Sequence, residues 1–241
     1  MADFGRGRGG WALLGVVGAL LLGAVPAALS AQDFDEDQLG AWYMLFWNTT
    51  FGDGPWGLQG DVQYRDWSIL GDREQLLIRA GGTWTPDGIP LTLTLGGASI
   101  TTGEFGDGDA TVSESRLYQE ALLSQRLGEV RLRHRYRSEQ RWVEGQDFRT
   151  RYRYALFVDV PLNGRGTGPG ALYIALYDEV FINGELEIGE GREVERFDRN
   201  RVYSGLGYGL NADFRIQGGY MLQTVVGGSK GQLQLSLHAT F

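Results

Sequence analysis

The sequence contains no cysteine and only two histidines, His134 and His238. The absence of cysteine excludes disulfides, cysteine-ligated zinc or iron–sulfur centres and thiol catalysis. Two histidines also argue against a multi-histidine metal site. We therefore expect no metal ion and no bound cofactor.

Lysine is nearly absent as well, because Lys230 is the only lysine among 22 basic residues. The planar guanidinium of arginine binds a carboxylate through two parallel hydrogen bonds and is more weakly hydrated than an ammonium group. This ratio favours a confined, ion-paired environment over an open surface, although a GC-rich coding bias would raise it too. The formal net charge of −8 argues against a nucleic-acid-binding protein.

The only long apolar run lies near the N-terminus. Arg6 and Arg8 precede an apolar stretch over residues 11–29, and small residues follow at 27–31. This order is typical of a secretory signal peptide. We predict a cleaved signal peptide over residues 1–31 and one mature domain over residues 32–241. An uncleaved membrane anchor is the alternative, because the run could span a bilayer.

The C-terminal segment alternates apolar and polar residues up to a final phenylalanine. Such alternation is typical of a strand with one apolar face. It resembles the signal that the barrel-assembly machinery of bacterial outer membranes reads in a last strand, and a soluble β-sandwich is the alternative. The residues expected to form this assembly signal are Leu233, Leu235, Leu237 and Phe241.

The same alternation predicts strands throughout the mature chain, separated by Gly-, Pro- and Asn-rich turns. The candidate segments are 41–51, 57–69, 73–85, 90–101, 113–127, 129–143, 147–160, 171–182, 198–209, 212–225 and 231–241. We predict one antiparallel transmembrane β-barrel. Bacterial barrels normally have an even strand number with both termini in the periplasm, which favours twelve strands over ten, with a missed strand near residues 33–40. The loops 102–112 and 183–197 would then face outward and the tight turns inward.

Tryptophan and tyrosine are expected towards strand ends or on outer faces, where they form girdles at the membrane–water interfaces. Trp42, Trp47 and Trp84 are among these residues. Gln119, Gln125, His134 and Ser138 interrupt the apolar pattern on expected outer faces. They indicate either bulged strands or positions above the hydrocarbon band.

Two neighbouring segments, 131–141 and 149–153, carry arginine at every second position except for Glu139. Like charges directly across a strand pair are destabilising, so these rows require nearby carboxylates. We predict a lumenal charge network, either structural or lining a solute-selective pore. Its expected members are Glu114, Arg116, Glu120, Arg131, Arg133, Arg135, Arg137, Glu139, Arg141, Arg149, Arg151, Arg153, Glu179 and Arg201.

Catalytic signatures are missing from the sequence. Neither histidine lies near a nucleophilic serine motif, and there is no Gly-x-Ser-x-Gly elbow. Ser236 and His238 share a strand face, but this spacing alone is common. We therefore predict that the protein is not an enzyme. The acidic loops 102–110 and 184–198 are expected to be solvated, with calcium bridging to lipopolysaccharide as the alternative.

Several motifs together resemble a bacterial family catalogued as domain of unknown function 2490, whose members are thought to be outer-membrane β-barrels. In order, they are Glu114-Ser-Arg116-Leu-Tyr-Gln119, Arg133-His-Arg135-Tyr-Arg137-Ser-Glu139-Gln-Arg141, Arg149-Thr-Arg151-Tyr-Arg153, Asp178-Glu179-Val-Phe181, Asn200-Arg201-Val-Tyr203-Ser-Gly205-Leu-Gly207-Tyr208 and Gly219-Tyr-Met-Leu-Gln223. The resemblance covers essentially the whole mature chain. It implies a fold and a location but no activity, so no catalytic residue is carried over.

These observations predict an integral outer-membrane barrel, passive and narrow or plugged by its own Arg/Glu network. Its expected partners are outer-membrane lipid and lipopolysaccharide, the assembly machinery and, for a pore, small polar or anionic solutes. The alternatives are a barrel that binds a surface partner through its acidic loops, a membrane-embedded lipid-modifying enzyme and a soluble periplasmic β-protein.

Overall fold

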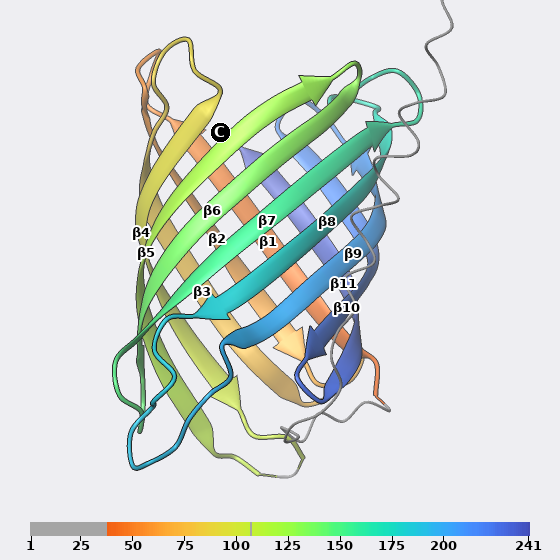
Figure 1. The fold of residues 1–241 in the computed structure, drawn as a ribbon. Helices are drawn as coiled ribbons and strands as arrows, with labels where there is room; N and C mark the ends of the chain where they lie inside the picture. The colour runs from red at the N-terminus through yellow and green to blue at the C-terminus, as the bar shows by residue number, and fades with distance from the viewer. Residues whose placement is uncertain (1–37, 107) are drawn as a thin grey trace, which may run out of the picture.

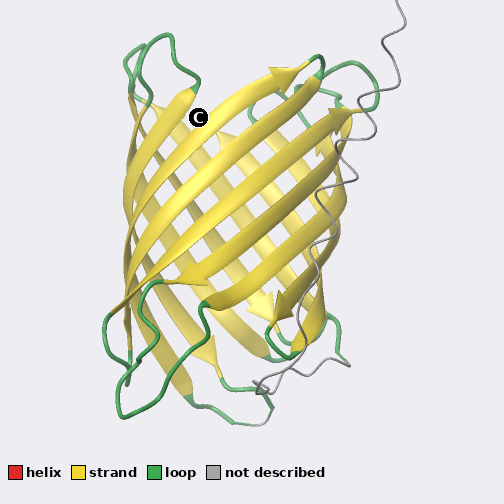
Figure 2. Ribbon diagram, viewed as in Figure 1, coloured by secondary structure: helices red, strands yellow, loops and turns green. Residues whose placement is uncertain are grey.

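The computed structural model describes residues 38–106 and 108–241, so the expected signal peptide lies outside the described residues. Within these ranges no helix is long and apolar enough to cross a membrane. The chain forms strands joined by turns and loops (Figure 2). They are β1 (Gly40–Thr50), β2 (Trp56–Asp66), β3 (Arg73–Trp84), β4 (Leu91–Gly103), β5 (Thr111–Leu127), β6 (Val130–Val143), β7 (Arg149–Pro161), β8 (Leu172–Asn183), β9 (Phe197–Gly209), β10 (Phe214–Val225) and β11 (Gly228–Thr240).

The strands close into a single barrel in which each strand pairs with its neighbour in the chain (Figure 1). All consecutive pairs are antiparallel, and the ring closes by a parallel pairing of β1 with β11, from Gly40 opposite Gln232 to Asn48 opposite Thr240. The eleven segments expected from the sequence all form strands, but the inferred even count of twelve or ten is wrong. A parallel seam allows an odd number of strands to close, and it leaves no place in the ring for a twelfth strand.

An odd strand number places the start of β1 and the C-terminus at opposite ends of the barrel (Figure 1). The expectation that the first strand starts on the side of the C-terminus is therefore wrong, and the N-terminus itself lies outside the described residues. The loops at 104–110 and 184–196 lie at the end where β1 starts, which we call the loop end. The turns at 128–129 and 210–213 lie with the C-terminus at the other end, which we call the turn end. The predicted separation of long loops from these short turns is confirmed.

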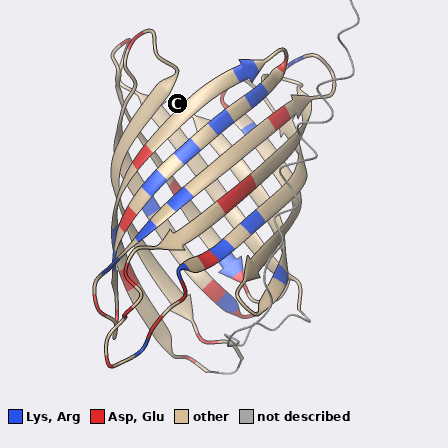
Figure 3. Ribbon diagram, in the orientation of Figure 1, with Lys and Arg blue, Asp and Glu red and all other residues tan. Residues whose placement is uncertain are grey.

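Side chains alternate between the two surfaces of the barrel wall. Along β11, Gln232 is fully buried inside, whereas Leu235 is 55% exposed outside. Figure 3 shows the charged positions as bands along the neighbouring strands β6, β7, β8 and β9. The burial pattern is thus inverted relative to a soluble barrel, with apolar side chains outward and charged side chains inward.

One part of the interior is filled by aromatic and small side chains rather than by charges. Buried Trp42, Tyr173, Tyr203 and Met221 form its centre with Ala171 and Ala175. A Cβ atom at Gly207 would collide with the ring of Tyr173, so the glycine makes room for the ring to lie against the wall. Trp42 lies towards a strand end as expected, because it is the third residue of β1, but the alternative of an outer-face position is wrong. Its side chain is inside, because its strand parity places it with Met44 and Phe46 on the lumenal face.

Candidate functional site: an ionic network inside the barrel

The arginine rows of β6 and β7 lie side by side on the inner wall. In the strand register Arg137 is opposite Arg153, Arg141 is opposite Arg149, and Glu139 is opposite Arg151. Two of these pairs bring like charges face to face, which is destabilising without counter-charges. The carboxylates of β5, β6, β8 and β9 supply them.

Glu139 is the centre of the network and is fully buried. Its carboxylate accepts hydrogen bonds from Arg151 (Nη2–Oε2 2.7 Å) and Arg153 (Nη1–Oε1 2.6 Å). Arg116 and Arg137 lie within 3.7 and 3.8 Å of the same carboxylate. One buried negative charge therefore serves four guanidinium groups.

Three more glutamates bind further arginines and share some of those that contact Glu139. Glu114 binds Arg116 and Arg141 at 2.6 and 2.5 Å, and Glu179 binds Arg135 and Arg153, each at 2.6 Å. Glu120 pairs with Arg137, with Arg135 at 3.8 Å. Each of these carboxylates is buried, so the pairs are shielded from solvent screening. The structure thus brings these arginines and glutamates of the predicted set together inside the barrel.

Not every predicted member joins a carboxylate. Arg201 donates to Gln223 (Nε–Oε1 2.7 Å) and stacks on Trp42, whose ring centroid is 4.7 Å away. Arg65 stacks on the same ring at 3.8 Å. Among the residues that the structure describes, Arg131 and Arg149 form no ion pair within 4 Å.

Several buried polar residues were not in the predicted set. Asp61 binds Arg79 at 2.8 Å, and Arg65 donates to Gln63 at 2.6 Å. These residues belong to β2 and β3, where Gln59, Asp61, Gln63 and Arg65 are polar at every second position. That alternation was a usable signal, but it is less conspicuous than a row of arginines.

Side chains from separated strands meet across the lumen. Gln59 on β2 donates to Glu120 on β5 (Nε2–Oε1 3.0 Å), and Tyr177 on β8 bonds Gln234 on β11 at 2.9 Å. Arg201 on β9 reaches Trp42 on β1. These contacts bridge the interior at several places and narrow the path that a solute could take.

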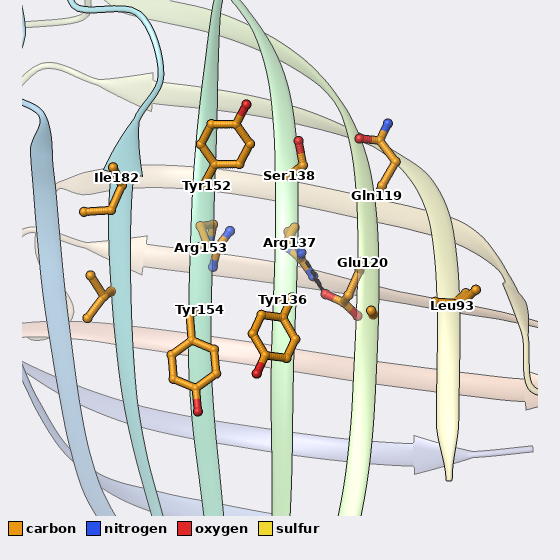
Figure 4. A pocket seen from close by; sticks show the side chains of 12 residues that line it. Leu93, Gln119, Glu120, Tyr136, Arg137, Ser138, Tyr152, Arg153, Tyr154 and Ile182 are labelled. Carbon is orange, nitrogen blue, oxygen red and sulfur yellow. Dashed lines mark hydrogen bonds and ion pairs between the residues drawn. The ribbon is translucent and has the colours of Figure 1, made fainter. Parts of the chain in front are cut away.

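The outer wall over β5–β9 carries polar groups among apolar ones. Gln119 and Gln140 bond through their amides at 3.0 Å, and the His134 ring lies 2.9 Å from the Tyr154 hydroxyl. Asn200 donates to Asp178 (Nδ2–Oδ1 2.5 Å). A groove of about 530 Å³ lies on this part of the wall (Figure 4), lined by Leu93, Gln119, Glu120, Ala121, Tyr136, Arg137, Ser138, Tyr152, Arg153, Tyr154, Val180 and Ile182.

The acidic loop at 184–196 is tied to the barrel rim by one carboxylate. Glu185 accepts hydrogen bonds from the Thr150 amide (2.5 Å) and hydroxyl (2.7 Å). These two bonds lower the pKa of the Glu185 carboxyl from its ordinary value. Glu187, Glu190 and Glu193 remain exposed at the loop end.

The predicted assembly-signal residues lie on the last strand and its end. Leu233 and Leu235 face outward and are 39% and 55% exposed, and Leu237 shares their face. Phe241 is 70% exposed, packs edge-on against Phe214 at 6.2 Å and donates its amide to the Asn48 carbonyl. The C-terminal residues therefore also hold the seam with β1.

Ser236 and His238 form a hydrogen-bonded pair inside the barrel, with Oγ and Nε2 3.0 Å apart. The imidazole stacks on Phe46, with ring centroids 4.9 Å apart. A catalytic serine–histidine pair also needs a group that orients the imidazole. The described contacts of His238 supply an aromatic ring in place of an orienting carboxylate.

The family model described as Protein of unknown function (DUF2490) matches residues 39–234. The chain belongs to this family. The match covers β1 to β10 and most of β11, so it includes the barrel and its ionic network. No curated protein and no solved structure matches the chain. Membership in DUF2490 thus identifies relatives but assigns neither an activity nor a ligand.

Proposed function

We propose that the protein is an integral β-barrel of the bacterial outer membrane whose lumen is closed by its own side chains. The observation that carries this proposal is the inverted burial pattern. Leu95, Leu206 and Leu235 are 60%, 56% and 55% exposed on the outer wall, whereas Glu139 and Gln232 inside are fully buried. Contiguous exposed apolar surface is unfavourable in water and matches the lipid-facing band of a membrane barrel.

Burial inside the barrel supports a closed state rather than an open diffusion pore. The side chains of Arg137, Arg151, Arg153 and Glu139 are between 1% and 5% exposed. A water-filled channel would leave such groups hydrated. Passage of small anions is therefore proposed only for a state in which part of the network has separated.

Cell fractionation and gel electrophoresis test the membrane part of this proposal. We expect the protein in the outer-membrane fraction and a band that shifts on heating, as folded barrels give in detergent. Recovery in the periplasm without detergent would contradict membrane insertion and favour the soluble alternative.

Planar-bilayer recording tests the closed lumen separately. We expect no steady conductance from the wild type. Arg135→Ala and Arg151→Ala remove the guanidinium groups that bind Glu179 and Glu139, and intermittent anion-selective openings of these variants would indicate a pore held shut by the network. A steady ohmic current through the wild type would contradict a closed lumen.

The polar outer wall favours a second candidate, a barrel that acts by contact with another membrane molecule. Gln119, Ser138 and Asp178 lie on strands whose outer faces would otherwise meet acyl chains, where polar side chains are unfavourable even when they bond one another. The outward residues Leu233, Leu235 and Leu237 on β11 contain no such groups.

Because the chain has no cysteine, single-cysteine crosslinking can compare the two walls. We expect Ser138→Cys to form a specific membrane adduct and Leu235→Cys, on the far side of the ring, to form none. Equal labelling of both positions would remove support for this second candidate.

A further inference from the structure

The inner wall near the turn end carries a group of arginines that the glutamate network does not reach. It consists of Arg126 on β5, Arg131 and Arg133 on β6, and Arg215 on β10, and we call it the turn-end arginine cluster. Arg126 and Arg131 are opposite each other in the strand register. Arg215 comes from a distant part of the ring, and its strongest electrostatic neighbours include Arg133. Two separated parts of the wall thus present cations to the same region.

Asp159 is the carboxylate that this cluster shares. It lies opposite Arg131 in the register and accepts from Arg133, with Nη2 and Oδ2 3.1 Å apart. Among the described residues, Arg126, Arg131 and Arg215 form no ion pair within 4 Å. In the network around Glu139, by contrast, neighbouring glutamates divide the arginines. Within the cluster itself, four arginines therefore share the one carboxylate of Asp159.

Two further observations indicate a ligand rather than simple repulsion. The Nε atom of Arg133, like that of several other arginines of the barrel, is buried without a hydrogen-bond partner among the residues that the structure describes, and an unsatisfied buried donor is costly. The cluster is also reachable from solvent. Arg126 is exposed and Arg131, Arg133 and Arg215 are half-buried, whereas the arginines around Glu139 are buried. A group that enters from the turn end can contact several guanidinium forks at once.

The electrostatic surroundings match this inference. The strongest neighbours of Arg131 are Arg133, Asp159, Arg215 and Arg126, and those of Arg215 are Arg133, Tyr173 and Asp159. His238 lies opposite Arg215 in the register and bonds Ser236. Among these strongest neighbours, Asp159 is the carboxylate that balances the arginines.

We propose that the turn-end arginine cluster binds a phosphate group inside the mouth of the barrel. Guanidinium groups bind oxyanions through paired hydrogen bonds, and a tetrahedral phosphate presents oxygens to several forks simultaneously. A monovalent halide offers no such geometry. The site is independent of membrane insertion, since all its residues belong to the barrel interior, and it can be tested in detergent whether or not the proposed location is correct.

Thermal unfolding of the full-length barrel in detergent, with inorganic phosphate as the probe, tests the site. Phosphate is titrated at constant ionic strength against sodium chloride, and unfolding is followed by heat-dependent gel mobility. We expect the midpoint of the wild type to rise with phosphate in a saturable manner, because a ligand of the folded state stabilises it. Arg131→Gln and Arg215→Gln should each weaken the apparent affinity about tenfold or more, since each removes a charge-assisted contact. Arg165→Gln, in the loop at 162–171 outside the cluster, is the matched control.

Asp159→Asn tests the same site with a change that should strengthen phosphate binding, whereas the arginine substitutions should weaken it. Asp159 competes with phosphate for Arg133, so removing its charge should tighten phosphate binding while lowering stability without phosphate. A purely structural role for the cluster would not produce this opposite response. If Arg215→Gln fails to fold, Arg215→Lys keeps the charge without the fork and should bind phosphate with reduced affinity.

The outcomes are distinct. No response of the wild type to phosphate, together with higher stability of Arg215→Gln in chloride alone, would overturn the proposal, because the cluster would then be only repulsive. Equal loss of response in Arg165→Gln would overturn it too.

Vesicles with and without phosphatidylglycerol, in phosphate-free buffer, identify whether the bound phosphate group belongs to a lipid. Stabilisation by this lipid that Arg131→Gln abolishes, without any by inorganic phosphate, would assign the phosphate to a lipid headgroup.

Discussion

Replacing Glu139 with glutamine removes the negative charge that Arg116, Arg137, Arg151 and Arg153 share. Glutamine has nearly the same size and keeps one carbonyl oxygen, so it isolates the charge from the packing. Removing one partner of a buried ion pair costs about 3–5 kcal/mol, because the other charge stays buried without compensation. We expect Glu139→Gln to cost about 3 kcal/mol, at the lower end of this range.

Urea unfolding in detergent micelles measures this loss through tryptophan fluorescence, since the chain contains seven tryptophans. In thermal unfolding of a chain of this length, a loss of about 3 kcal/mol corresponds to a fall of about 6–12 °C in the midpoint temperature. Glu187→Gln is the matched control, because this glutamate is exposed in the loop at 184–196. Its effect should stay within about 0.5 kcal/mol.

A double-mutant cycle with Arg153→Gln separates the ion pair from general damage to the interior. Arg153 donates to both Glu139 and Glu179, so its removal relieves part of the charge imbalance that Glu139→Gln creates. We expect the double variant to be more stable than the sum of the single effects predicts, by about 1–3 kcal/mol. Additive effects, or a loss in Glu139→Gln no larger than in Glu187→Gln, would refute the assignment of Glu139 as the centre of the network.

Three further predictions address the wall, the loop and the topology. Gly207→Ala should lower stability by about 1–3 kcal/mol because its methyl group would overlap the Tyr173 ring, whereas Gly218→Ala, whose nearest neighbours would lie 3.9 Å away, should be nearly neutral in the same urea titration. The lowered pKa of Glu185 means that its contact with Thr150 is fully present above the unfolded pKa and is lost as pH falls through the folded value. Limited proteolysis of the loop at 184–196 should therefore accelerate on acidification, and Glu185→Ala should be cleaved rapidly at every pH. In intact cells, a C-terminal epitope and a cysteine placed at Glu187 should be accessible from opposite sides of the membrane, and access to both from one side would contradict the odd-stranded topology.

The strands were predictable because period-two alternation fixes both the element and the face of each residue. Each predicted arginine and glutamate of the central network faces inward, and two further carboxylates, Asp159 and Asp198, also bind arginines. The strand number was not predictable from a rule about bacterial barrels. Whether β1 meets β11 in a parallel or an antiparallel pairing depends on contacts between the two ends of the chain, which local pattern does not encode.

Sequence pattern also could not identify partners across the lumen. Alternation places Arg201 on the inner face, but the position of Trp42 beneath its guanidinium depends on the curvature of the closed barrel. Trp42 was expected at a strand end or on an outer face because tryptophan is common in interfacial girdles. At this position the large ring instead fills a part of the interior that is lined by small residues.

The position of Trp42 also connects closure of the barrel to neutralisation of its interior. Arg65 on β2 and Arg201 on β9 both stack on this ring, and β1 joins β11 through the parallel seam. In the closed barrel Arg201 donates to its neighbour Gln223, and its guanidinium group lies over the Trp42 ring. The parallel ladder is slightly less stable per residue than an antiparallel one, so side-chain contacts across the seam have to contribute to closure. Two hydrogen bonds also support closure. The bond from Phe241 to Asn48 ties the end of the chain to β1, and the bond between Tyr177 and Gln234 ties β11 to β8. The seam therefore places the Trp42 ring against Arg65 and Arg201, and these contacts add to the stability of the closed barrel.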